Sequence, residues 1–180
     1  MTKFVCKSIK EISVKDIQKF SLKKETSGYL EHYLKDDAIK DEIDNTMRTY
    51  VVLDSDTEEI VGYFSLKTNI IAIDDGKRYD SLPAIEMANF AVNDNYKLAH
   101  NDASGLGKMI VSDFVLPIVR QISELVGTWG LCIYALPQDR LIDFYHSIGF
   151  SRLPVRYERR LHRRVKPTYD KDCIFMFQKI

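Results

Sequence analysis

Cysteine is scarce in this sequence: Cys6, Cys132 and Cys173 are the only three among 180 residues, and they lie far apart. No His, Cys or Asp cluster has metal-ligand spacing, so no metal is expected. An odd cysteine count without a signal peptide predicts free thiols and a cytoplasmic protein. Cys132 and Cys173 fall in apolar runs, where we expect them to be buried packing residues.

An excess of charge and a long apolar run are also missing. Lys and Arg total 26, as do Asp and Glu, so the formal net charge is zero. This excludes the strong overall field of many nucleic-acid or membrane binders, although a local patch stays open. No run approaches the roughly 18 apolar residues that a membrane span requires. The length and composition fit one globular domain with its own core.

The most informative stretch surrounds Ser104-Gly105-Leu106-Gly107-Lys108. An apolar, β-prone run (84–92) precedes it and a mostly apolar helical run (109–119) follows, which predicts strand, glycine turn and helix. Such a turn aims backbone N–H groups, together with the positive end of the helix dipole, at a bound phosphate or pyrophosphate. It is neither a Walker A loop nor a dinucleotide fingerprint, whose third glycine would fall at Ile110. A tight turn used for packing alone is the alternative.

The rest of the chain reads as alternating strands and helices. We expect strands at 3–9, 48–53, 59–67 with a continuation at 69–73, 84–92, 129–135, from 150 onward, and at 173–177. We expect helices at 13–20, from 29 through 38, from the glycine turn to a stop at Gly127, and from 137 to a stop at Gly149. Loops are expected at 74–81 and 93–102. Gly62, inside a strand, predicts a bulge or a close backbone approach.

The glycine turn and a second motif, Phe144-Tyr145-His146-Ser147-Ile148-Gly149-Phe150, stand about forty residues apart with a helix and a strand between them. This order resembles the GNAT superfamily of acyl-CoA-dependent N-acetyltransferases, most clearly from Arg48 to Phe150. The resemblance implies an α/β fold with a mixed, mainly antiparallel central sheet flanked by helices. It also implies one acetyltransferase domain over residues 1–180, with CoA in a splay between the two central strands.

The approach to the glycine turn departs from the family pattern. The family has a basic or amide residue three positions before the first glycine, whereas this chain has Asp102. Val92 is also further from Gly105 than is usual. We interpret this as an insertion, in which Lys97 takes the usual basic position and 98–103 loops out. An acid beside a pyrophosphate would weaken binding unless it points away.

The resemblance implies roles for particular residues, with acetyl-CoA as co-substrate. Backbone N–H groups of Ser104, Gly105, Leu106, Gly107 and Lys108 would hold the CoA pyrophosphate, and the backbone of Phe90, Ala91 and Val92 would pair with the pantetheine arm. Lys97, Gln138 and Phe144 complete the expected cofactor-binding set. Tyr145 stands at the general-acid position, where its hydroxyl would meet the CoA sulfur; a packed aromatic is its alternative.

Glu86 is the expected general base, because it is the only acid in an apolar strand and faces the same side as Val92. A surface carboxylate at a strand edge is the alternative. His146 and His100 are weaker candidates: His146 follows Tyr145 on its helix and points elsewhere, and His100 lies in the inserted segment.

The amine acceptor is open at this point. A small molecule or a protein amino group is one class. Apolar positions between Phe20 and Leu66 and the Ala135-Leu136-Pro137 run also look like the GNAT toxins that acetylate aminoacyl-tRNA. A basic segment could then meet RNA phosphates; it comprises Arg152, Arg156, Arg159, Arg160, Arg163, Arg164 and Lys166. A non-catalytic acyl-CoA-binding domain, which Asp102 favours, is a further alternative. Dimers are usual in the family, which leaves a homodimer open.

Overall fold

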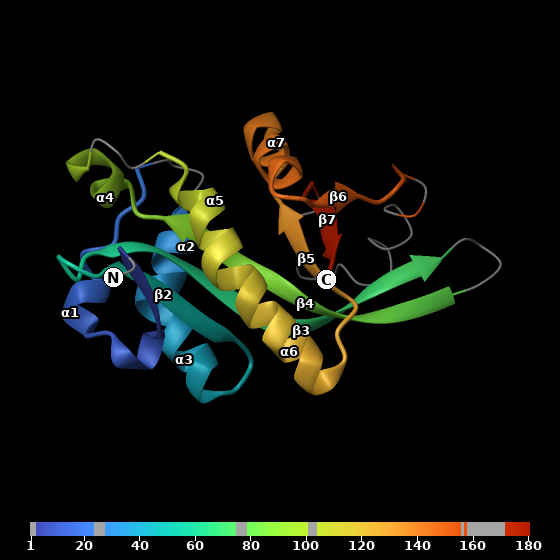
Figure 1. The fold of residues 1–180 in the computed structure, drawn as a ribbon, viewed down its shortest axis with the longest axis horizontal. Coiled ribbons are helices and arrows are strands. Elements are labelled where there is room, and N and C mark those ends of the chain that lie inside the picture. The colour runs from blue at the N-terminus through green and yellow to red at the C-terminus, as the bar shows by residue number, and fades with distance from the viewer. Residues whose placement is uncertain (1–2, 24–27, 75–78, 101–103, 156, 158–171) are drawn as a thin grey trace. The chain divides into compact units, whose positions relative to one another are not determined.

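The computed structural model describes residues 3–23, 28–74, 79–100, 104–155, 157 and 172–180. Their strands form one sheet in the order β1-β2-β3-β4-β5-β7-β6 (Figure 1). Among the described residues, the pairings β1–β2, β2–β3, β5–β7 and β6–β7 are antiparallel, and β4–β5 is parallel. The predicted mixed, mainly antiparallel α/β fold is therefore confirmed. The chain divides into two compact units, residues 1–67 with 88–115 and residues 68–87 with 116–180.

The first unit starts with β1 (Phe4–Ser8), which pairs with β2 (Arg48–Asp54). β2 pairs in turn with β3 (Ile60–Asp74), whose residues from Thr68 belong to the second unit. The register between β2 and β3 shifts at Val52/Leu53, beside Gly62. A Cβ built on Gly62 would lie 2.7 Å from the Ala91 carbonyl oxygen and 2.8 Å from Cδ1 of Ile110. The expected close backbone approach at Gly62 is confirmed, since only glycine leaves room there.

Short helices cover one face of these strands. They are the 3-10 turn η1 (Ile9–Glu11), α1 (Val14–Ile17), α2 (Gly28–His32), the π-helical segment η3 (Tyr33–Asp37) and α3 (Ala38–Ile43). Ser13 caps α1, and its Oγ accepts from the Asp16 N–H at 3.1 Å. The core of the unit joins these helices to β2, β3 and β4 through buried residues such as Phe20, Leu34 and Tyr63. Tyr29 is 67% exposed, because it lies in the first turn of α2 ahead of that core.

β4 (Tyr79–Val92) belongs to both units, and the end of β4 in the first unit leads to α4 (Asp94–Ala99). A loop was expected over 93–102, and this expectation was wrong for 94–99. Asn93 supplies the helix cap, with its side-chain oxygen accepting from the Asn95 N–H at 3.1 Å, and Tyr96 is buried below the helix. A cap and one buried aromatic are enough to order a helix of this length against a core.

The helix after the glycine turn begins as α5 (Leu106–Ile110) and continues through the π-helical segment η4 (Val111–Val115). The chain runs on into α6 (Leu116–Val126), and Gly127, with φ of +66°, ends it as predicted. Ile110, Val111 and Val115 are buried. The predicted strand–turn–helix order is confirmed.

The second unit holds β5 (Gly130–Ala135), α7 (Asp139–Ser147), β6 (Ser151–Arg152) and β7 (Ile174–Lys179). β5 is buried along almost its whole length, as its apolar sequence predicts, and pairs with β4 over Ala84–Glu86 and with β7. Gly149, with φ of +98°, ends α7 as predicted. Cys132 and Cys173 are buried, which confirms their packing role.

The loop expected at 74–81 is shorter than the polar sequence indicated. β3 extends to Asp74 and β4 begins at Tyr79, because pairing in the sheet carries strands past their apolar residues; 75–78 lie outside the described residues. Pro83 lies inside β4, and its carbonyl accepts from the Trp129 N–H at 2.8 Å. Among the described residues, none of the helices has both the length and the apolarity needed to span a membrane.

Candidate functional site in the two units

The glycine turn has the geometry expected of an anion-binding helix start. Gly105 adopts φ of +75° at the N-cap of α5, and no side chain caps the helix. The first bond within the helix runs from the Met109 N–H to the Gly105 carbonyl at 3.0 Å, so the N–H groups of Leu106, Gly107 and Lys108 have no partner inside it. Ser104, Gly105 and Lys108 are exposed. A Cβ on Gly105 would meet no atom within 4 Å, so the space above the turn is open.

Phe90, Ala91 and Val92 form the end of β4 in the first unit. Ala91 belongs to the core of the unit, beside Tyr63 and Val51, whereas Phe90 and Val92 are half-buried. The Ala91 carbonyl oxygen and the Val92 Cα lie against Gly62. This contact fixes the backbone of the three residues that were assigned to the pantetheine arm.

Lys97 lies in α4, where its Nζ contacts Asp94 Oδ1 at 3.0 Å. Leu98 and Ala99, expected to loop out with the insertion, also belong to that helix, and Asp102 lies outside the described residues. His100, a weaker base candidate, stacks on Tyr96 with ring centroids 4.0 Å apart and contacts Glu59 at 3.1 Å. These contacts give His100 a packing role.

Glu86 lies in the second unit and is 1% exposed, which excludes the alternative of a surface carboxylate. It stands opposite Cys132 in the parallel pairing with β5. Asn69 of β3 donates to Glu86 Oε2 at 2.6 Å. A buried carboxylate held by an amide donor has a fixed orientation, which a general base needs. Sequence reasoning missed Asn69.

Tyr145 lies on α7 and is nine-tenths buried, between the rings of Phe144 and Phe150 at centroid distances of 5.2 and 5.7 Å. Burial raises the pKa of the Tyr145 hydroxyl above its usual range. The hydroxyl makes no hydrogen bond within the described part of the chain. A protonated hydroxyl with no competing acceptor suits a general acid. His146, next to it, is exposed and contacts the Phe150 carbonyl at 2.9 Å.

Gln138 lies at the start of α7, and Phe144 lies within the same helix. Gln138 is the N-cap residue of α7, but its side chain makes no cap bond; its backbone carbonyl accepts from Leu141 and Ile142. Phe144 is half-buried against Tyr145. Both positions belong to the second unit, with Tyr145 and Glu86.

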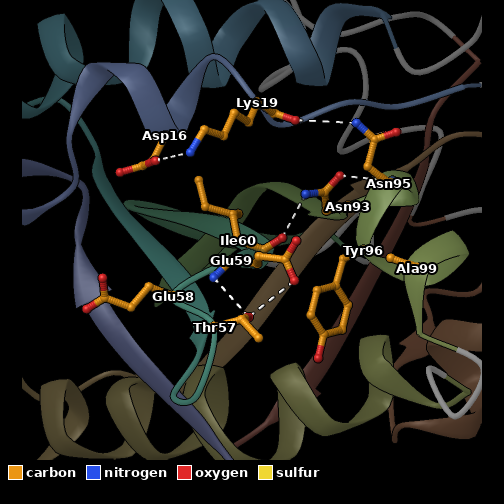
Figure 2. A pocket seen from close by; sticks show the side chains of 10 residues that line it. All are labelled: Asp16, Lys19, Thr57, Glu58, Glu59, Ile60, Asn93, Asn95, Tyr96 and Ala99. Atoms are coloured by element: carbon orange, nitrogen blue, oxygen red, sulfur yellow. Dashed lines mark hydrogen bonds and ion pairs between the residues drawn. The ribbon is translucent and has the colours of Figure 1, made fainter.

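A polar cavity of about 460 Å³ lies elsewhere in the first unit, between α1, the β2–β3 turn and α4. Figure 2 shows Tyr96 and Glu59 on its wall, with Lys19 reaching Asp16, which it contacts at 2.6 Å. None of the residues assigned to catalysis or cofactor binding lines it, although Tyr96, the neighbour of Lys97 on α4, does. The cavity is therefore separate from the glycine turn.

Sequence reasoning missed a buried polar group in the first unit, formed by Tyr33, Thr49, Ser65 and Asn89 with Met47. Each of the four polar side chains is 3% exposed or less. The signal available in the sequence was Asn89, an amide inside the apolar run that leads to the glycine turn.

The fold is that of a group of solved toxin structures. A tyrosine-to-phenylalanine mutant of the AtaT toxin superimposes with a TM-score of 0.73 at 18% identity, over 98% of this chain and 89% of that chain. AtaTR bound with AcCoA gives 0.68 at 18%, over 99% and 94%. AtaT complexed with acetyl-methionyl-tRNAfMet gives 0.68 at 17%, over 96% and 93%. No family model matches the chain. The likeness confirms the GNAT-like fold.

Proposed function

We propose that this protein is an N-acetyltransferase that moves an acetyl group from acetyl-CoA to a primary amine, by direct attack in a ternary complex. The observation that carries the proposal is the glycine turn: Gly105 in a left-handed conformation at an uncapped helix start, within a fold shared with a protein that binds AcCoA. In this proposal, residues 1–180 together act as one acetyltransferase domain.

Ser104, Gly105, Leu106, Gly107 and Lys108 would hold the pyrophosphate through their backbone N–H groups. The backbone of Phe90, Ala91 and Val92 would pair with the pantetheine arm as an added strand, and Gln138 and Phe144 would add cofactor contacts. Because Asp94 already pairs with Lys97, we assign Lys97 no direct contact with the pyrophosphate and only a contribution to the local positive potential.

Glu86 would accept the proton of the attacking amine, and Tyr145 would protonate the departing thiolate. The environment of each residue supports its role. Glu86 is buried and oriented by Asn69, and the Tyr145 hydroxyl is buried and protonated. Amine attack needs a neutral nucleophile, and thiolate departure needs a proton, so the two residues supply complementary steps.

An amino group carried by aminoacyl-tRNA is the second candidate acceptor, because the fold is shared with AtaT, which was solved with acetyl-methionyl-tRNAfMet. Of the basic segment, Arg152 lies in β6 and is exposed, whereas Arg156, Arg159, Arg160, Arg163, Arg164 and Lys166 lie outside the described residues. A small molecule or a protein amino group remains the broader class of acceptor.

Calorimetric titration with acetyl-CoA, and separately with dephospho-CoA and NAD, tests cofactor binding first. We expect micromolar acetyl-CoA affinity that Gly107→Glu abolishes, because a carboxylate then occupies the anion site. Gly28→Glu is the matched control: it adds the same group where a Cβ would meet nothing within 4 Å, and should bind like the wild type. Absence of acetyl-CoA binding would refute the proposal.

Turnover is then measured as CoA thiol release with small amines, a protein acceptor and charged tRNA. Release that depends on an acceptor supports the transferase, and acetylated aminoacyl-tRNA formed in a salt-sensitive reaction selects the second candidate. Tight acetyl-CoA binding without release on any acceptor, and without change on Tyr145→Phe, would instead establish a non-catalytic acyl-CoA-binding domain.

A further inference from the structure

Glu86 is held by a side chain from the neighbouring strand. β3 and β4 are adjacent in the sheet, and Asn69 of β3 and Glu86 of β4 both belong to the second unit. Asn69 Nδ2 donates to Glu86 Oε2 at 2.6 Å, a short distance that is typical of a hydrogen bond to a charged carboxylate. Because Glu86 is 1% exposed, water competes little for this oxygen.

Another hydrogen bond of Asn69 fixes which end of its amide faces Glu86. Asn69 Oδ1 accepts from the Ile70 N–H at 2.7 Å. The opposite orientation of the amide would place its oxygen against the carboxylate and its nitrogen against the Ile70 N–H, and both contacts would be repulsive. Asn69 therefore acts toward Glu86 as a donor only.

A donor at one carboxylate oxygen decides where the carboxylate takes up a proton. If Glu86 were protonated on Oε2, the new O–H would compete with the Asn69 N–H for the same oxygen, and a buried hydrogen bond would lose most of its strength. Protonation of Oε1 keeps that bond intact. In the proposed reaction, the proton of the attacking amine would therefore arrive on Oε1, the oxygen that Asn69 does not engage.

Other titratable groups lie near this pair in the strands. Cys132 stands opposite Glu86 in the parallel register, and Tyr134 follows two residues further on the same face of β5. Burial raises the pKa of the Tyr134 hydroxyl above its usual range, and the nearby Cys132 and Glu86 raise it further, so this hydroxyl stays protonated at neutral pH. The remaining titratable groups nearby are Lys67, two residues before Asn69 in β3, Asp80 in β4, and Tyr157, which packs against the core cluster that contains Cys132. Their titration is common to the wild type and to variants of Asn69.

We propose that Asn69 is a positioning residue for Glu86, which occupies Oε2 and directs the proton of the attacking amine to Oε1. This inference rests on the proposed transferase function. In the reaction, the amine nitrogen bonds to the acetyl carbon, its proton passes to Glu86 Oε1, the carbon–sulfur bond breaks, and Tyr145 protonates the thiolate. Proton exchange with solvent then restores both side chains.

The test follows kcat/KM against pH, as CoA thiol release, for the wild type, Asn69→Leu and Asn69→Asp. Spermidine, a lysine-containing peptide and charged tRNA serve as acceptors, and the fastest of the three is used for every variant. Ile71→Val is the matched control, because Ile71 is fully buried two residues further along β3 and its loss of a methyl group leaves the bond between Asn69 and Glu86 in place.

We expect Asn69→Leu to lower kcat/KM about tenfold at neutral pH, the effect of losing a hydrogen bond to a charged group. The ratio of variant to wild-type kcat/KM should fall further as the pH is lowered, because a carboxylate without its donor takes up a proton at a higher pH, by about one pH unit. This ratio cancels the titration of the amine itself. Asn69→Asp should fall more steeply, since two facing carboxylates share a proton, and Ile71→Val should give a ratio that does not change with pH.

A double-mutant cycle with Glu86→Gln separates positioning from a general structural role. If Asn69 acts through Glu86, adding Asn69→Leu to Glu86→Gln should leave the residual kcat/KM unchanged. Acetyl-CoA titration and urea unfolding check that each protein is folded. The double variant contains no buried carboxylate deprived of its donor, so the cycle stays informative if Asn69→Leu alone fails to fold.

A loss on Asn69→Leu that is equally large in the Glu86→Gln background, or that does not vary with pH, would overturn the positioning role. A wild-type rate for Asn69→Leu or for Glu86→Gln would also overturn it and leave the transferase standing. No acetylated product from the wild type with any of the three acceptors would remove the proposed function and this inference together.

Discussion

A glycine can be required either because a side chain would clash with its neighbours or because its φ is positive, and three glycines of the first unit allow these two reasons to be compared. Gly62 has no room for a methyl group, because its Cβ would lie 2.7 Å from the Ala91 carbonyl oxygen. Gly105 has room, but its φ is +75°. Gly28 has room and no positive φ. Alanine at the three positions therefore tests the architecture around the proposed cofactor strand.

For Gly62→Ala we expect a loss of about 1–3 kcal/mol in the free energy of unfolding, the usual cost of overpacking a core. The backbone atom in contact cannot swing aside as a side chain end can, so the strand carrying Ala91 and Val92 must shift. For a chain of this size, each kcal/mol lowers Tm by about 2–4 °C. Acetyl-CoA affinity should fall as well, since the shifted residues are those assigned to the pantetheine arm.

For Gly105→Ala we expect a loss of about 1–2 kcal/mol from the left-handed conformation alone, with weaker acetyl-CoA binding. Gly28→Ala should be neutral or stabilising by about 0.4–1 kcal/mol, since alanine reduces the freedom of the unfolded chain. Urea unfolding and acetyl-CoA calorimetry on the three variants measure both effects. A Gly62→Ala protein as stable as Gly28→Ala would refute the close contact between β3 and β4 at this point.

Three further predictions concern titration and charge. Tyr145→Phe should lower kcat at least tenfold with little loss of acetyl-CoA affinity. Because burial raises the pKa of Tyr145, the unfolded state ionises first above about pH 10, so wild-type stability should fall there and Tyr145→Phe should lessen the fall in alkaline urea titrations. The Tyr96 hydroxyl, 2.5 Å from Asp54, lowers the pKa of that buried carboxyl. The bond therefore stabilises the folded protein above about pH 4, and this stabilisation is lost as the pH falls further. Tyr96→Phe should lower the free energy of unfolding by about 1.5–3 kcal/mol at neutral pH and weaken its dependence on pH below about 4, as measured by urea unfolding. Lys97→Met should change acetyl-CoA affinity less than twofold, because Asp94 already pairs with Lys97. A tenfold loss of affinity in calorimetry would instead show that Lys97 contacts the pyrophosphate.

The strands and the glycine turn could be predicted from the sequence because their signals are local. A short apolar run such as 130–135 between turn residues is typical of a buried strand, and Gly149 stops a helix by its own conformational freedom. The close approach at Gly62 could be expected for the same reason, although its partner, Ala91, could not be identified. Neighbouring residues in the sequence determine whether a strand or helix forms, whereas the residues that it packs against depend on the whole fold.

The polar contacts could not be predicted, because they join positions distant in sequence. Asn69 and Glu86 are 17 residues apart, and Tyr33 reaches Thr49 across 16. Burial removes the surface alternative for Glu86, whose role as a base stays a prediction. For Tyr145, burial leaves both the packed aromatic and the general acid standing. Pairing of polar side chains on different elements requires the register of the sheet, which no single-sequence pattern encodes.

The segment that follows β4 is tied to the core of the first unit by several hydrogen bonds. Asn93 donates to the Ile60 carbonyl at 2.7 Å and accepts from the Ser21 N–H at 3.3 Å, while Asp94 accepts from the Lys23 N–H at 3.0 Å. Tyr96 reaches Asp54 below the helix. These bonds tie α4 to the N-terminal segment and to the β2–β3 hairpin, both of which belong to the same core. The end of β4 is thereby held in place by α4 on one side of Val92 and by the contact of Ala91 and Val92 with Gly62, so the backbone of the proposed cofactor strand has a fixed position within the first unit.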